Sequence, residues 1–370
     1  MATILVTGAN GFLGKNFCLR AFEEGHTLLP VTRSTKDEDI VSAVANADIV
    51  FHFAGVNRPE TEDEFVIGNV DFTQKICSQI RVCGRVLPMI ISSSAQAELD
   101  NAYGLSKKAA EDIVFKYGKD VGAPVHVFRL PNVFGKWCKP HYNSAVATFC
   151  HNISRGVPIK INDPAIVLRL VYIDDVIDRF LEIITHSSVG AGWAKIAPVY
   201  EATVGEIVNL LYGFAETRRN MITAPVGVGL VRALYSTYIS YLPSDKFTYS
   251  IPLHCDPRGS FVEMLKTQDS GQFSYFTAHP GVTRGEHYHH SKTEKFLVIR
   301  GTAHFGFRQV VTGELHEVVI RGGEGQIVET IPGWTHNITN IGEDEMIVML
   351  WANEIFDRAR PDTIAMKVKE

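Results

Sequence analysis

The sequence lacks the features that mark several common classes of protein. Its six cysteines form no Cys-x-x-Cys pair, which argues against a disulfide-stapled domain and favours free thiols in a reducing compartment. It contains no run of about 18 apolar residues and no charged start followed by a long apolar stretch. We therefore expect no membrane span and no signal peptide, and we expect a cytoplasmic protein.

An excess of positive charge is also missing. The 370 residues include 36 Lys and Arg against 41 Asp and Glu, a formal net charge of −5, whereas a general nucleic-acid or membrane-surface binder carries a basic field. We therefore expect no nucleic acid as a partner. Apolar residues make up 45% of the chain and charged residues 21%, so a packed core is expected and wholesale disorder is excluded.

The first part of the chain alternates short apolar runs with helical periods. This alternation predicts an α/β Rossmann-type fold, a doubly wound parallel sheet with helices on both faces. The expected strands are 4–7, 28–32, 48–54, 86–92 and 125–129, and the expected helices are 16–24, 64–80 and 103–116.

The sequence pattern changes after Pro252, where helical periods disappear and Gly-containing turns separate short expected strands. That pattern is typical of a small β-barrel or a double-sheet roll. The break lies where Pro243 and the two residues after it end a helix expected over 231–241. We therefore predict two domains, 1–243 and 244–370. The expected strands of the second domain include 296–300, 316–320 and 346–351.

A glycine-rich string, Gly8-Ala9-Asn10-Gly11-Phe12-Leu13-Gly14, directly follows the first expected strand and opens the first helix. Glycines there permit a tight turn and close approach of the backbone to a pyrophosphate, while the helix N-terminus offers free N–H groups. An ordinary strand-to-helix turn is the alternative interpretation. The residues expected to bind a dinucleotide are Gly8, Asn10, Gly11, Phe12, Leu13 and Gly14.

The residue after the second strand bears on which dinucleotide binds. That strand ends in Val31-Thr32-Arg33-Ser34. NAD-binding units usually place an acid here, on the ribose 2′-hydroxyl, whereas an arginine suits a 2′-phosphate. Arg33 therefore predicts a preference for NADPH, and a solvated surface arginine is the alternative.

A tyrosine and a lysine lie four residues apart in Tyr103-Gly104-Leu105-Ser106-Lys107, and hence on one face of a helix. A nearby cation stabilises a phenolate and lowers the pKa of a tyrosine. Such a tyrosine can pass a proton to or from a sugar oxygen as hydride moves. Upstream, the run Ser92–Ser94 ends a strand and is placed to hydrogen-bond a substrate carbonyl.

With these elements in this order, the chain resembles the extended short-chain dehydrogenase/reductase family of nucleotide-sugar epimerases, dehydratases and reductases. The resemblance covers roughly residues 1 to 240. The strings that carry it are the glycine loop, Asp48-Ile49-Val50-Phe51-His52-Phe53-Ala54-Gly55, Gly68-Asn69-Val70, the serines, the Tyr–Lys pair, Arg129-Leu130-Pro131-Asn132-Val133-Phe134-Gly135 and Arg169-Leu170-Val171-Tyr172-Ile173-Asp174-Asp175-Val176.

The resemblance implies a role for each matching residue. Tyr103 would be the general acid, and Lys107 would tune its pKa and bind the cofactor ribose. Ser94 would donate to the carbonyl, with Ser93 as the alternative, and Asn69 would be a structural and proton-relay residue. The remaining implied positions are Ala54 and Gly55, flanking the ribose, and Asn132 and Arg169, facing the sugar nucleotide.

Histidines gather in the second domain. His287 and His289 alternate on an expected strand, so both point to one face, and Glu294 and a distant His336 follow. Three imidazoles and a carboxylate suit Zn, Fe, Mn or Ni. The spacing resembles the two metal-binding motifs of the cupin family, which implies an all-β jelly roll holding a divalent metal, with zinc as the first candidate. Three nearby histidines, His290, His304 and His316, are not expected as ligands.

A second resemblance overlaps the first. The strings 256–263 and 281–288 are similar to the dTDP-sugar 3,5-epimerase family, itself a cupin. That family implies substrate-facing roles for Arg258 and Arg284, and a role as the proton-removing base for His287. The ligand role of His287 is preferred, because those epimerases lack the second His and the Glu. The candidates for the base are then Lys295 and His290.

Together the two halves resemble bacterial capsular-polysaccharide or O-antigen enzymes that make UDP-2-acetamido-2,6-dideoxy-L-talose, in the UDP-N-acetyl-L-fucosamine pathway. The resemblance implies C3 epimerisation of a UDP-linked 4-keto-6-deoxy-HexNAc in the cupin, then NADPH-dependent reduction at C4.

One alternative is a plain reductase whose cupin is a structural or dimerisation module, and another is a cofactor-sensing regulator. A homodimer is expected because cupin sheets have edges that a partner often covers. The metal, the sugar and the base stay open.

Overall fold

The computed structural model describes residues 1–185, 192–359 and 361–369. The chain divides into two compact units. The first comprises residues 1–211 and 233–242, and the second comprises residues 212–232 and 243–370. Each unit has its own sheets and its own apolar core.

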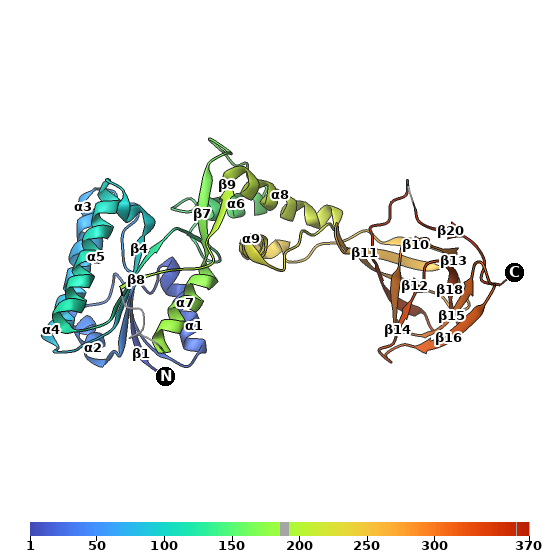
Figure 1. The fold of residues 1–370 in the computed structure, drawn as a ribbon, viewed down its shortest axis with the longest axis horizontal. Coiled ribbons are helices and arrows are strands. Elements are labelled where there is room, and N and C mark those ends of the chain that lie inside the picture. Colours follow the sequence, from blue (N-terminus) through green and yellow to red (C-terminus); the bar gives the residue numbers. More distant parts are fainter. Residues whose placement is uncertain (186–191, 360, 370) are drawn as a thin grey trace. The chain divides into compact units, whose positions relative to one another are not determined.

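A six-stranded parallel sheet forms the centre of the first unit, in the order β2-β1-β3-β4-β5-β8. Helices cover both faces, with α2, α4 and α5 on one side and α1 and α7 on the other (Figure 1). The predicted Rossmann-type arrangement is thus confirmed. The strands are β1 (Thr3–Thr7), β2 (Thr27–Val31), β3 (Ile49–His52), β4 (Met89–Ser94), β5 (Val125–Leu130) and β8 (Gly192–Ala194), and the helices are α1 (Phe12–Glu23), α2 (Asp37–Asn46), α4 (Phe72–Val82), α5 (Ala102–Val121) and α7 (Ile173–Thr185).

The central strands are apolar on both faces because helices bury both faces. On the side of α4 and α5, Val50, Met89 and Ile76 pack in one buried cluster. On the other side the core is aromatic, with the rings of Phe17 and Phe51 4.1 Å apart. This double burial fixes the register of the sheet and therefore the place where each strand ends.

A smaller sheet and several helices complete the first unit. The strands β6, β7 and β9 form a three-stranded sheet in that order. A short π-helix over Val66–Asp71 interrupts the expected helix 64–80, and such bulges are frequent at functional sites. The other strands and α-helices are β6 (Asn132–Phe134), β7 (Val167–Tyr172), β9 (Tyr200–Thr203), α3 (Asp63–Phe65) and α6 (Ala145–Ser154). The helices α8 (Val204–Asn220) and α9 (Gly229–Ser240) each belong partly to this unit and partly to the second.

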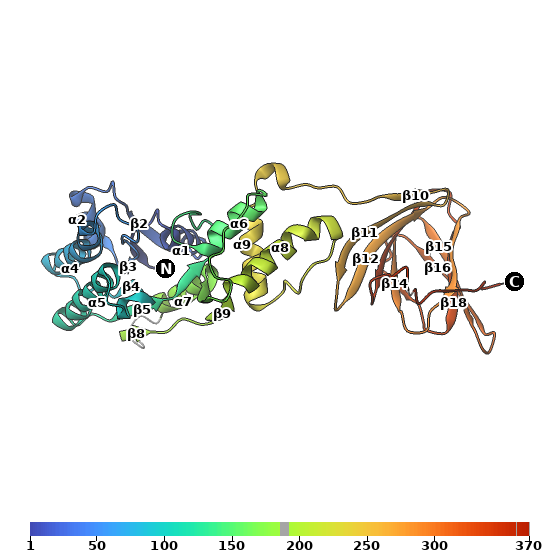
Figure 2. The same ribbon diagram turned by 90° about the horizontal axis from the view of Figure 1, so that it is seen from above.

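The second unit is built from two antiparallel sheets, ordered β10-β11-β12-β19-β14-β17 and β16-β15-β18-β13-β20. Figure 2 shows strands of the two sheets facing each other. The strands are β10 (His254–Asp256), β11 (Gly259–Thr267), β12 (Gly271–Ala278), β13 (Thr283–Tyr288), β14 (Glu294–Arg300), β15 (Thr302–Gln309), β16 (Leu315–Arg321), β17 (Ile327–Glu329), β18 (Trp334–Asn340), β19 (Met346–Ala352) and β20 (Ile364–Ala365).

Side chains from both sheets fill the space between them. Phe276 and Phe296 of the first sheet pack in one buried cluster with Phe305, Phe307 and Ile338 of the second. Alternating residues along each strand point into this core, as expected for two sheets packed face to face. The prediction of an all-β second part is confirmed at this level.

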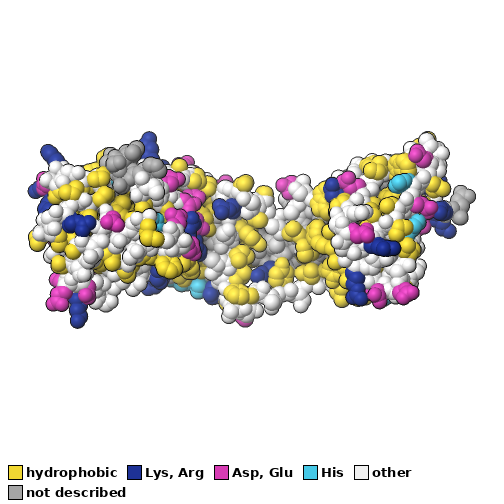
Figure 3. All heavy atoms as spheres, turned by 90° about the horizontal axis from the view of Figure 1, so that it is seen from below, with side chains coloured by type: hydrophobic (Ala, Val, Ile, Leu, Met, Phe, Trp, Pro, Cys, Tyr) yellow, Lys and Arg dark blue, Asp and Glu magenta, His cyan; other side chains and the backbone are white. Residues whose placement is uncertain are grey.

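The surface agrees with the charge balance of the sequence. On the face drawn in Figure 3, basic and acidic side chains are interspersed over both units. Within the part of the chain that the structure describes, no helix is long and apolar enough to cross a bilayer.

Candidate functional site

The predicted cofactor residues gather at the carboxyl ends of neighbouring parallel strands, where nucleotides bind in open α/β sheets. Gly8 has a φ of +67°, and a Cβ there would lie 2.7 Å from the backbone nitrogen of Ala54, just past β3. A Cβ on Gly14 would lie 2.2 Å from the Gly8 carbonyl oxygen. Helix α1 begins after Gly11 without a side-chain cap, so its first N–H groups stay available. The remaining loop residues, Asn10, Phe12 and Leu13, lie between these glycines.

The end of β2 adjoins this loop. The Ala9 N–H donates to the Val31 carbonyl at 3.3 Å, and Arg33 follows two residues later with an exposed side chain. On the other side of β1, Gly55 follows β3, and a Cβ there would lie 2.9 Å from Asn69 Oδ1. The structure therefore brings together the residues predicted to flank a dinucleotide.

The predicted Tyr–Lys pair lies at the start of α5. The Asn101 side chain caps this helix by accepting from the Gly104 N–H at 2.8 Å. The Lys107 ammonium is buried and donates to the Ser92 carbonyl at 2.8 Å. Burial lowers the pKa of Lys107 to about 8, and Glu111 opposes that shift. Lys107 is therefore tied to β4 near its carboxyl end, beside Gly55 of the segment that follows β3.

The pKa of Tyr103 differs from the prediction made on the sequence. Burial raises it above the usual range, and a hydrogen bond from Ser94 opposes the shift. The expected lowering by Lys107 is not among the causes of this shift, of which desolvation of the phenol is the largest. A phenol that holds its proton suits the role of a general acid.

The two candidate serines have different surroundings. The Ser93 hydroxyl is buried and donates to the Glu111 carboxylate. Ser94 is partly exposed, and its hydroxyl accepts from the Gln96 N–H at 3.1 Å. Of the two, Ser94 is the one whose hydrogen bond acts on Tyr103.

Behind this pair lies a buried carboxylate that the sequence analysis did not single out. Glu111 is 1% exposed, and its two oxygens accept from Arg129 Nε at 3.0 Å and Arg129 Nη2 at 2.6 Å. Arg129 also binds Glu98 at 2.9 Å. The spacing Tyr103, Lys107, Glu111 could have revealed it, because positions four apart share a helix face.

Asn69 connects the π-helix to the site. Its Oδ1 accepts from the Val56 N–H at 2.7 Å, and its Nδ2 donates to the Ser106 hydroxyl at 2.9 Å. Ser106 in turn donates to the Tyr103 carbonyl at 2.7 Å. Asn69 therefore holds the loop after β3 against the turn of α5 that carries Tyr103.

The two residues implied to face the sugar nucleotide lie on the small sheet. Asn132 on β6 donates to the Arg169 carbonyl on β7 at 3.0 Å. The Arg169 guanidinium is exposed and lies 3.5 Å from Glu201. The structure places these two residues side by side.

In the second unit, all four predicted metal ligands converge. One donor atom from each of His287, His289, Glu294 and His336 lies within 4.8 Å of the others. Glu294 Oε2 lies 3.2 Å from His289 Nε2 and 3.5 Å from His336 Nε2. This donor set is of the type that binds a divalent ion such as zinc.

Electrostatics in this cluster favour a neutral His287 beside an ionised Glu294. Burial lowers the pKa of His287 to about 4, and the neighbouring His336 and His289 lower it further. Burial acts to raise the pKa of Glu294, but hydrogen bonds from His289 and His336 hold it well below its usual range. Neutral histidine and ionised carboxylate are the forms that bind metals.

The strand that carries His287 departs from simple alternation. Strand β13 ends at Tyr288, so His289 lies just beyond it. A bulge at Glu286, whose φ is +61°, separates the pairs Arg284↔Ile338 and His287↔His336. The extra residue turns Arg284 and His287 to the same face, since residues directly opposite in a ladder share a face.

The predicted arginines have distinct environments. Arg284 is partly buried, with its guanidinium 5.2 Å from the centre of the Phe276 ring. Burial lowers its pKa, Arg258 adds to that shift, and Asp256 opposes it. Arg258 donates to Asp256, with Nη2 2.6 Å from the carboxylate. The charges of Arg258 and Asp256 both act on Arg284, and Asp256 offsets part of the positive charge.

The two candidate bases are more exposed than the four residues of the cluster. Lys295 is half exposed and pairs with Glu329 at 2.5 Å. His290 is exposed, and its ring lies 5.4 Å from that of Tyr288. The four-residue cluster includes neither side chain.

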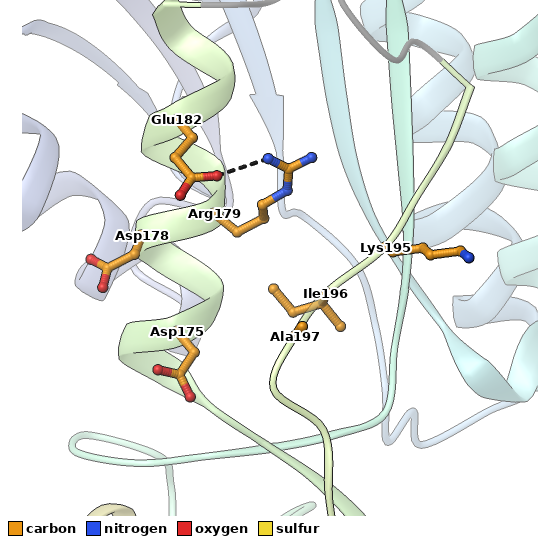
Figure 4. A pocket seen from close by; sticks show the side chains of 7 residues that line it. All are labelled: Asp175, Asp178, Arg179, Glu182, Lys195, Ile196 and Ala197. Atoms are coloured by element: carbon orange, nitrogen blue, oxygen red, sulfur yellow. Dashed lines mark hydrogen bonds and ion pairs between the residues drawn. The ribbon is translucent and has the colours of Figure 1, made fainter. Parts of the chain in front are cut away.

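A pocket of about 400 Å³ lies elsewhere in the first unit. Figure 4 shows carboxylates along α7, with Arg179 bound to Glu182, facing the segment of Lys195. No predicted site residue lines this pocket. Its charged lining has three carboxylates against two basic side chains, a balance that does not favour the phosphates of a sugar nucleotide.

Comparison with known proteins matches both units. Residues 4–194 match the model of the NAD dependent epimerase/dehydratase family. Residues 254–364 match that of the polysaccharide biosynthesis C-terminal domain.

Two relatives match over the whole length. A UDP-2-acetamido-2,6-beta-L-arabino-hexul-4-ose reductase of Pseudomonas aeruginosa is 55% identical over 368 residues, 99% of each chain. The crystal structure of the capsular polysaccharide assembling protein CapF of Staphylococcus aureus has a TM-score of 0.91 at 40% identity, covering 98% of this chain and 99% of that one. A UDP-N-acetylglucosamine 4-epimerase of Bacillus cereus shares the fold alone, with a TM-score of 0.54 at 18% identity over 65% of this chain and 99% of its own.

Proposed function

This chain belongs to the NAD dependent epimerase/dehydratase family, and from that premise we propose that it reduces the C4 ketone of a UDP-linked 2-acetamido-2,6-dideoxy-4-hexulose. The observation that carries the proposal is the convergence of Tyr103, Lys107 and Ser94 at the carboxyl end of the parallel sheet, beside the glycine loop. The 4-ulose reductase named for the P. aeruginosa relative supports the same reaction.

In the proposed reduction, Ser94 binds the C4 carbonyl oxygen and Tyr103 donates a proton to it. Ser94 is preferred to Ser93, because the Ser93 hydroxyl is already committed to Glu111. Lys107 binds the ribose and supplies positive charge next to the phenol. A nicotinamide cofactor, when bound, supplies the hydride. We propose NADPH, held by Arg33, by Ala54 and Gly55, and by the loop residues Gly8, Asn10, Gly11, Phe12, Leu13 and Gly14.

We further propose that the second unit is a cupin with a metal-dependent C3 epimerase site. His287, His289, Glu294 and His336 would hold a divalent ion, preferably zinc, which polarises the C4 carbonyl when bound and so acidifies the C3 proton. Arg258 and Arg284 would bind the substrate phosphates. Epimerisation precedes reduction, because the C3 proton is acidic only while C4 is a ketone. The product would be UDP-2-acetamido-2,6-dideoxy-L-talose, for capsule or O-antigen synthesis.

The domain boundaries, the cellular location and the oligomeric state are also part of the proposal. We propose functional domains of 1–243 and 244–370, with Asn132 and Arg169 of the first facing the sugar nucleotide. The six free cysteines support a cytoplasmic enzyme, and edge strands such as β16 support a homodimer.

A plain reductase is the second candidate, because the name of the P. aeruginosa relative specifies a reductase and no epimerase. In that case the second unit is a structural module. Removal of its metal would leave the stereochemistry of the product unchanged. A cofactor-sensing regulator would show no turnover at all.

The test is Tyr103→Phe, which removes the proton donor and leaves the second unit unchanged. NADPH oxidation should fall by about 10²- to 10⁴-fold, the usual contribution of a general acid. Exchange of the C3 proton with D₂O, followed by NMR, should persist. Tyr212→Phe, at an exposed position on α8, is the control and should change neither rate. Unchanged NADPH oxidation in Tyr103→Phe would refute the reductase site, and loss of both activities would refute two separate sites.

A further inference from the structure

The last residues of the chain lie against the histidine–glutamate cluster. We call residues 361–369 the C-terminal strap. Its strand β20 pairs with β13, with Ala365 opposite His287 and Ile364 opposite Tyr288. The strap therefore continues the sheet next to a predicted metal ligand, although its own sequence shows no ligand pattern.

Asp362, in the strap, organises the loop that follows β13. Its carboxylate accepts from the backbone N–H groups of His290 at 2.9 Å, Ser291 at 2.7 Å and Lys292 at 2.8 Å. It also accepts from the Ser291 hydroxyl at 3.0 Å. Four hydrogen bonds to one carboxylate fix the conformation of the loop between His289 and Glu294.

The backbone of Asp362 acts on a predicted ligand directly. Its carbonyl oxygen accepts a hydrogen bond from His289 Nδ1. Because a carbonyl can only accept, Nδ1 is the donor in this bond, and Nε2 is the ring nitrogen left to face the cluster. Nε2 is the atom that lies 3.2 Å from Glu294 Oε2. The strap thus sets the orientation of His289.

The next residue of the strap acts on the carboxylate ligand. The Thr363 hydroxyl lies 3.2 Å from the buried Lys292 ammonium. That ammonium lies 3.8 Å from Glu294 Oε1. Oε1 is thereby held on the side away from the histidines, and Oε2 is presented to them.

The far end of the strap is anchored on the strands that carry the other two ligands. The Met366 N–H donates to the Glu286 carbonyl at 2.9 Å, and the Val368 N–H donates to the Glu286 carboxylate at 2.8 Å. The Thr335 hydroxyl, next to His336, donates to the Met366 carbonyl. Val368 is 2% exposed, so this end is packed as well as hydrogen-bonded.

We propose that Asp362 is a positioning residue of the metal site and that the C-terminal strap preorganises His289 and Glu294 for metal binding. The inference rests on the proposed metal site. Partners of this kind, which orient the ligands without touching the ion, commonly change metal affinity 10- to 100-fold. Asp362 exerts this effect through its own carbonyl and through a loop, although it lies 73 residues from His289 along the chain.

The experiment compares zinc binding to four full-length proteins by competition with a chromophoric chelator. They are wild type, His289→Ala, Asp362→Ala and the control Asp344→Ala, which removes an exposed carboxylate of the same unit. Wild type and Asp344→Ala should bind zinc equally tightly. His289→Ala should lose tight binding, and Asp362→Ala should bind about 10- to 100-fold more weakly.

A second readout separates positioning from a general loss of stability. Cobalt(II) replaces zinc, and its visible absorption bands report the geometry of the ligands. These bands should change in Asp362→Ala and stay unchanged in Asp344→Ala. A purely structural role would lower the melting temperature of Asp362→Ala while leaving its zinc affinity and cobalt spectrum as in wild type, and that result would overturn the inference.

The outcomes distinguish this inference from the metal site on which it rests. If wild type and His289→Ala bind zinc equally, the metal site itself fails. If His289→Ala loses zinc but Asp362→Ala matches wild type, only the strap inference fails. Should Asp362→Ala not fold, Asp362→Asn keeps the side-chain volume, and an intermediate loss of affinity in that variant is the expected result.

Discussion

Arg33 stands at the end of β2, where dinucleotide-binding folds distinguish a ribose hydroxyl from a ribose phosphate. Its side chain is exposed, so it is available to a 2′-phosphate. Arg33→Ala should lower kcat/KM for NADPH by about 10- to 100-fold, since a charge-assisted hydrogen bond contributes about 1.5–3 kcal/mol. The kcat/KM for NADH should change little, and steady-state kinetics with both cofactors measure the ratio.

The control for Arg33 is Lys36→Ala, which removes an exposed positive charge three residues further along the chain. If the preference arises from general positive potential, both variants will lose it equally. If Arg33→Ala keeps the wild-type ratio of the two cofactors, the assignment of Arg33 is wrong.

For single residues, the sequence predicts those that lie close to their partners along the chain. It does not predict those whose partners are far away in sequence. Tyr103 and Lys107 are one helical turn apart, and His289 and Glu294 are close in sequence, so a pattern shows them. Asp362 contacts a loop more than 70 residues away, and no local pattern encodes such a contact. The pKa of Tyr103 was predicted in the wrong direction because burial is a property of the fold.

Helix α5 is the element on which the proposed reductase chemistry depends. Tyr103, Lys107 and Glu111 occupy successive turns of one face. Lys107 is held to β4 by Ser92, and Glu111 is held to β4 by Ser93 and to β5 by Arg129. The carboxylate therefore acts on Lys107 from within a buried network rather than from solvent, where its field would be screened.

Glu111→Gln tests that network. Glu111 raises the pKa of Lys107, which burial alone lowers, and the balance lies at about 8. Removal of the negative charge should lower this pKa further, so Lys107 loses its proton at a lower pH. The basic limb of the pH–rate profile for reduction should then move to lower pH.

Glu98→Gln is the matched control, because Glu98 binds the same arginine from an exposed position. It should leave the basic limb where it is. A basic limb in Glu111→Gln that coincides with wild type, together with a lower melting temperature, would limit Glu111 to a structural role.

The elements differ in how far the sequence predicted them. Strand–helix alternation is a local signal, so the five strands predicted for the first unit lie within a few residues of observed ones. The observed helices α2, α6 and α7 were not predicted. The π-helix at 66–71 was not expected, and neither was the bulge at Glu286. A bulge is defined by the partner strand, here β18, and the sequence of one strand does not contain that information. His289 was expected on the same strand as His287, but that strand, β13, ends at Tyr288.

Considered as a whole molecule, the chain carries two candidate sites, one within each unit. The reductase cluster lies on α5 and the ends of β1–β4, and the metal cluster lies on β13, β14 and β18. The β-strand character of the chain after Pro252 was readable from its Gly-containing turns. Its strand order was not, because pairs such as β12 with β19 join segments about 70 residues apart, and only the fold brings them together.

The last prediction follows from this separation. A chelator that removes the metal should abolish exchange of the C3 proton with D₂O, because the polarised carbonyl is what makes that proton acidic. Reduction of a substrate already epimerised at C3 should survive, since Tyr103 and Lys107 belong to the other unit. Added zinc should restore exchange and raise the melting temperature of the second unit, with roughly 2.7 kcal/mol of stabilisation at 100 times Kd. Continued C3 exchange after the metal has been removed would make the metal structural, and His287 would then become the candidate for the catalytic base.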